Sequence, residues 1–109
     1  MLQLREHKGR MSLDEYREQL IGRLKSCTNT AAARTLLAEA DLVLVNARLT
    51  SLTQGKFWES LDEDLETARE EARLLADREA GVKLAAVIVV AQARIARFRE
   101  RLSEDPARE

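Results

Sequence analysis

The stretch that decides the fold spans residues 59–101 and reads ESLDEDLETAREEARLLADREAGVKLAAVIVVAQARIARFRER. Residues 59–71 hold seven acids and one base, whereas residues 94–101 hold four bases and one acid. Gly81 lies about midway between the two blocks. If the chain reverses direction there, Ala68 faces Arg94 and Leu65 faces Arg97. The acidic segment then lies alongside the basic segment. The pattern therefore predicts a long antiparallel helical hairpin at the C-terminal end.

A chain reversal at Gly81 has an alternative, because the segment after it contains no serine, threonine or aspartate to cap a new helix. A single continuous helix from Leu61 to Leu102 is then possible. The apolar stripe of the last helix is out of phase with the stripe before it, which would continue through Val82, Ala86 and Val89. This phase break favours a turn at Gly81 over a continuous helix.

Helix signals upstream complete an all-α bundle of about four helices. Ser12-Leu13-Asp14-Glu15 is a capping box, which predicts a helix over residues 13–26. A second helix is expected over 31–53, with Gly55 just after its end, and a third over 60–80. The expected organisation is a flexible N-terminal arm (1–11), a single helical domain (12–103) and a flexible C-terminal tail (104–109).

Composition supports a small soluble protein with one domain. The chain has 109 residues, of which 34% are charged and 45% apolar, and its net charge is −1. The single cysteine, Cys27, excludes a disulfide within the chain and fits a reducing compartment. No secretory signal is visible, and the most apolar run, residues 84–91, is far shorter than the ~20 residues of a membrane span. We therefore expect a cytoplasmic protein without membrane contact.

The same apolar run predicts either a central bundle helix or the seam of a homodimer, since residues 84–91 are apolar on nearly every side. We expect a homodimer. Its predicted interface residues share one stripe of the last helix and are Leu84, Val87, Ile88, Ala91, Ile95 and Phe98.

Two large aromatic residues, Phe57 and Trp58, stand in the predicted connector between the second and third helices. Either they close the end of the bundle core, or they anchor a partner protein, since exposed tryptophan is favoured at interface centres. They are the predicted partner-binding residues.

No residue pattern in the sequence indicates an enzyme active site, a metal site or a cofactor site. His7 is the only histidine and Cys27 the only cysteine, so neither a metal cluster nor a nucleophile with an organised base is expected. No glycine-rich phosphate loop occurs. The acids of residues 59–71 are more typical of a solvated or salt-bridged helix face.

These observations favour a small non-enzymatic protein-binding regulator that occludes a partner's interaction surface. In size and composition alone the chain looks like bacterial secretion chaperones or small helical anti-activators, although no motif carries that likeness. The alternative is a dimeric nucleic-acid-binding transcriptional regulator whose phosphate contacts would be Arg94, Arg97 and Arg101. A purely structural subunit of a larger assembly is a third possibility.

Overall fold

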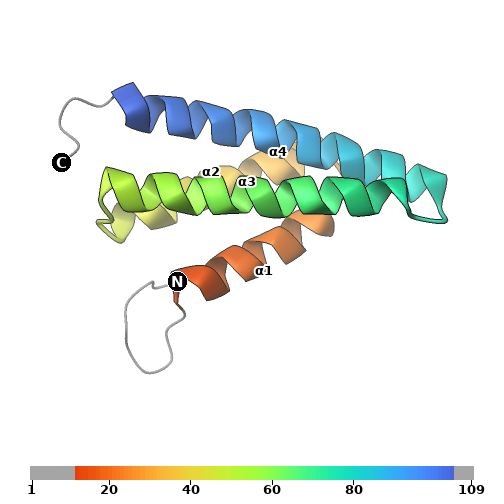
Figure 1. The fold of residues 1–109 in the computed structure, drawn as a ribbon, viewed down its shortest axis with the longest axis horizontal. Helices are drawn as coiled ribbons and strands as arrows, with labels where there is room; N and C mark the ends of the chain where they lie inside the picture. The colour runs from red at the N-terminus through yellow and green to blue at the C-terminus, as the bar shows by residue number, and fades with distance from the viewer. Residues whose placement is uncertain (1–11, 105–109) are drawn as a thin grey trace.

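Four helices and their connectors make up the part of the chain that the computed structural model describes, residues 12–104 (Figure 1). They are α1 (Leu13–Lys25), α2 (Thr30–Asn46), α3 (Ser51–Arg73) and α4 (Arg78–Glu104). Within these residues there is no strand, so the predicted all-α bundle is confirmed. The predicted arm (1–11) and all but the first residue of the predicted tail (104–109) lie outside the described residues.

The start of α1 follows the capping box. Ser12 Oγ accepts the backbone N–H of Glu15 at 3.1 Å, and the backbone N–H of Ser12 donates to Glu15 Oε1 at 2.8 Å. Two of the backbone donors that a helix leaves unpaired at its start are thus satisfied. The predicted first helix is confirmed.

The boundary between α2 and α3 differs from the prediction, which continued the second helix to residue 53. α2 ends at Asn46, and Arg48 reverses the chain with a left-handed φ of 60°. Thr50 then caps α3, because its Oγ1 accepts the backbone N–H of Thr53 at 3.1 Å. Gly55 consequently lies inside α3, and the two aromatic residues that follow it belong to a helix rather than to a connector.

The turn between α3 and α4 also differs from the prediction. The chain turns at residues 74–77, where Asp77 Oδ1 accepts the backbone N–H of Ala80 at 3.1 Å and so caps α4. Gly81 lies in the first turns of α4, so it is neither the turn nor the midpoint of one continuous helix. A Cβ at Gly81 would lie 2.7 Å from the backbone oxygen of Ala72. This glycine therefore allows α4 to approach α3 closely.

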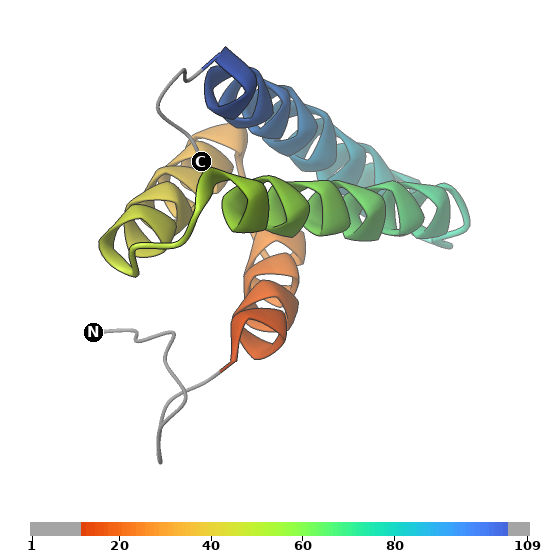
Figure 2. The ribbon, with the colours of Figure 1, turned by 60° about the vertical axis from the view of Figure 1, so that its left-hand side comes forward.

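The two longest helices, α3 and α4, lie side by side and antiparallel, with α1 against α3 and α2 against α4 (Figures 1 and 2). At the turn, this pair extends beyond the ends of α1 and α2 (Figure 1). We call this projecting end, residues 69–85, the hairpin tip. Its turn is uncovered, since every residue from 73 to 80 is exposed. No described helix is both long and apolar enough to cross a membrane.

One core joins all four helices, and aromatic rings run through it. Tyr16 stacks on Phe57 with ring centroids 5.9 Å apart, Phe57 meets the edge of Trp58 at 5.1 Å, and Trp58 contacts Phe98 at 4.7 Å. The rest of the core is mainly leucine and alanine from every helix. Burial of this apolar surface is the main source of stability for a bundle of this kind.

The charges pair differently from the predicted alignment of residues 59–71 with residues 94–101. Within the described residues, Asp64 of α3 pairs with Arg17 of α1 at 2.9 Å, and Glu71 pairs with Lys25 of α1 at 3.6 Å. Arg101 of α4 pairs instead with Asp41 of α2 at 3.0 Å. Because the turn precedes Gly81, the register of α3 against α4 is shifted, and the predicted facing pairs do not form.

Candidate protein-contact surfaces

Phe57 and Trp58, the predicted partner-binding residues, are inside the molecule. Their exposed fractions are 3% and 0%, and both rings pack on other aromatic rings of the core. They offer no surface to a partner, which corrects the anchor prediction. The alternative role, closing the core, matches their placement.

The six predicted dimer-interface residues are also turned inward. Five of them are buried within the chain's own core, from Val87 to Phe98, and Leu84 is half-buried against it. The stripe faces α3 and α2 rather than solvent, which corrects the predicted seam. Another face of α4 has to be considered for any contact between copies.

The outward face of α4 carries a second apolar stripe, which we call the outer stripe. Its members are exposed and recur at alternating intervals of four and three residues: Val82, Ala86, Val89, Ala93 and Ala96. Val82 is 69% exposed and Val89 49% exposed. This spacing is that of a coiled-coil seam, in which two helices pack along one face.

Charged groups border the outer stripe. On the α3 side, Gln92 Nε2 donates to Glu66 Oε1 at 3.1 Å, so the acidic segment of α3 lies level with the C-terminal half of the stripe. At the hairpin tip, three arginines line a hollow of about 340 Å³ together with Val82: Arg69, Arg73 and Arg78. Two of these arginines are already paired along α3, Arg69 with Glu66 and Arg73 with Glu70, so both signs of charge border the stripe.

The three arginines predicted to contact phosphate do not form one free cationic surface. Arg101 makes two hydrogen bonds to Asp41, at 3.0 and 3.2 Å, and its guanidinium lies over the Phe98 ring at 5.5 Å. Asp41 raises the pKa of Arg101 through these bonds. Arg94 is half-buried, whereas Arg97 is exposed.

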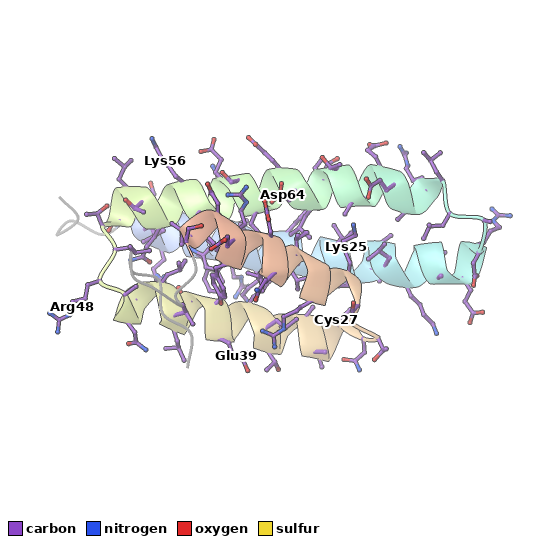
Figure 3. All side chains as sticks on the ribbon, turned by 90° about the horizontal axis from the view of Figure 1, so that it is seen from below. Lys25, Cys27, Glu39, Arg48, Lys56 and Asp64 are labelled. Atoms are coloured by element: carbon purple, nitrogen blue, oxygen red, sulfur yellow. The ribbon has the colours of Figure 1, made fainter. Side chains whose placement is uncertain are left out.

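A groove of about 880 Å³ separates α1 from α2. Small side chains from both helices line it, with Leu36 and Cys27 along its floor and charged groups at its edges; the lining residues are Gln19, Gly22, Arg23, Ser26, Cys27, Thr28, Ala32, Thr35, Leu36 and Glu39. Figure 3 shows Cys27 in the connector at one end of α2 and Glu39 along that helix. A Cβ at Gly22 would meet no atom within 4 Å. The groove is thus open at Gly22 and has an apolar floor.

Two titratable groups at or near this groove, Cys27 and Tyr16, have raised pKa values. Burial raises the pKa of the Cys27 thiol, and Arg23 offsets this only in part, so the thiol stays protonated near neutral pH. Its Sγ donates to the backbone oxygen of Arg23 at 3.5 Å. Burial also raises the pKa of the Tyr16 hydroxyl, which Arg23 lowers and Glu39 raises.

Comparison with known proteins gives no relative: no family model, no curated protein and no solved structure matches the chain. The interpretation of the groove and the outer stripe therefore depends on their geometry alone.

Sequence reasoning missed both surfaces for different reasons. The groove depends on the separation between α1 and α2, which no local sequence pattern encodes. The outer stripe did have a signal, because the spacing of Val82, Ala86 and Val89 is visible in the sequence. These residues were noted only as the phase in which the stripe of the preceding helix would continue, and not as a surface.

Proposed function

We propose that the chain is a small non-enzymatic regulator that receives a helix of a partner protein in the groove between α1 and α2. By covering that helix, it would occlude the partner's own contact surface, as anti-activators and secretion chaperones do. A cytoplasmic, bacterial setting is part of this proposal, and the single cysteine supports a reducing compartment.

The observation that carries the proposal is the groove itself. It is a wide hollow of about 880 Å³ that is open to solvent, which suits an elongated helix better than an enclosed small molecule. Gly22, Ser26 and Ala32 present little side chain, so a helix can approach to the 8–10 Å separation at which helices pack. Recognition of an amphipathic helix in an apolar groove is a common mode of peptide binding.

The groove's edges indicate which helix fits. Leu36 and Cys27 suit an apolar stripe on the incoming helix, whereas Arg23 and Glu39 present one charge of each sign. A partner helix with an apolar face and an acid and a base beside it would satisfy all of these groups.

Gly22→Leu tests the proposal, because open space around the position lets the fold tolerate a side chain that fills the groove. The control is Gly55→Leu, on α3, where a Cβ likewise meets nothing within 4 Å. Tagged protein would be used to capture partners from a lysate of the source organism, with nuclease treatment and identification by mass spectrometry. We expect a stoichiometric protein bound by wild type and Gly55→Leu and lost by Gly22→Leu.

Equal capture by both variants would place the contact elsewhere, and capture of nucleic acid in place of protein would favour the arginine alternative. That alternative has no support from Arg101, which is already bound to Asp41. We therefore do not propose it.

A further inference from the structure

We draw no further inference here: the strongest candidate, the outer stripe along the outward face of α4, is bordered by both signs of charge, and nothing in the described part of the chain shows what covers it.

Discussion

At Gly81 α4 lies close to the backbone of α3, and replacement of this glycine by alanine has two opposing effects. Alanine favours a helix by about 1 kcal/mol over glycine. At this position, however, its Cβ would lie 2.7 Å from the backbone oxygen of Ala72, which cannot move without shifting a helix. We expect Gly81→Ala to lower the free energy of unfolding by about 1–3 kcal/mol, measured by urea denaturation.

Two other glycines are the controls for that measurement. Gly22 and Gly55 also lie inside helices, but a Cβ at either position meets no atom within 4 Å. Alanine at these sites should therefore raise the free energy of unfolding by about 0.5–1 kcal/mol. If all three substitutions changed stability in the same direction, the close approach at Gly81 would be refuted.

Arg48 is the one described residue other than glycine with a positive φ, at 60°. A left-handed conformation costs residues with a Cβ about 1–2 kcal/mol, a strain that glycine avoids. We expect Arg48→Gly to raise the free energy of unfolding by up to about 1 kcal/mol, and Arg48→Val to lower it, since β-branched residues tolerate this conformation poorly. Thermal unfolding of the two variants gives the comparison, and a stable Arg48→Val protein would contradict the expectation.

At the scale of the helices, the sequence predicted elements better than boundaries. The capping box at Ser12 was recognised because both of its partners are visible in sequence. The turn at Arg48 was missed because an arginine stands where glycine or asparagine usually marks a helix end. The cap at Asp77 was missed because the turn was predicted at Gly81, four residues further along the chain. The wrong boundary then led to the anchor prediction, since it placed Phe57 and Trp58 in a connector.

The start of α4 depends on a single side chain, which makes it testable. Asp77 Oδ1 accepts the backbone N–H of Ala80, so Asp77→Ala should lower the free energy of unfolding by about 1 kcal/mol. Asp77→Asn keeps an acceptor oxygen and should retain most of that stability. Both are measured by denaturant unfolding followed by circular dichroism. Equal losses in the two variants would show that the negative charge, rather than the hydrogen bond, stabilises this helix start.

At the scale of the whole molecule, Trp58 is the largest fully buried side chain of the shared core within the described residues. It is fully buried between Phe57 and Phe98, and its Nε1 has no hydrogen-bond partner within the described residues. Trp58→Ala should lower the free energy of unfolding by about 3–5 kcal/mol. Trp58→Phe should cost no more than about 1 kcal/mol, because the cavity it leaves is partly offset by removal of the unpaired N–H. A stable Trp58→Ala protein that had lost only partner binding would instead restore the anchor role.

The projecting hairpin tip should be the least stable part of the bundle, because its contact residues are small and its one described ion pair to another helix, Glu71 with Lys25 of α1, is exposed. Ala72 and Gly81 meet at this end, whereas the body of the bundle buries leucine, isoleucine and aromatic side chains. Amides of the tip should therefore exchange with solvent by local opening. Amides from Val87 to Phe98 should exchange only on global unfolding. Hydrogen exchange measures both classes of amide, and tip amides as protected as those of the core would contradict the expectation.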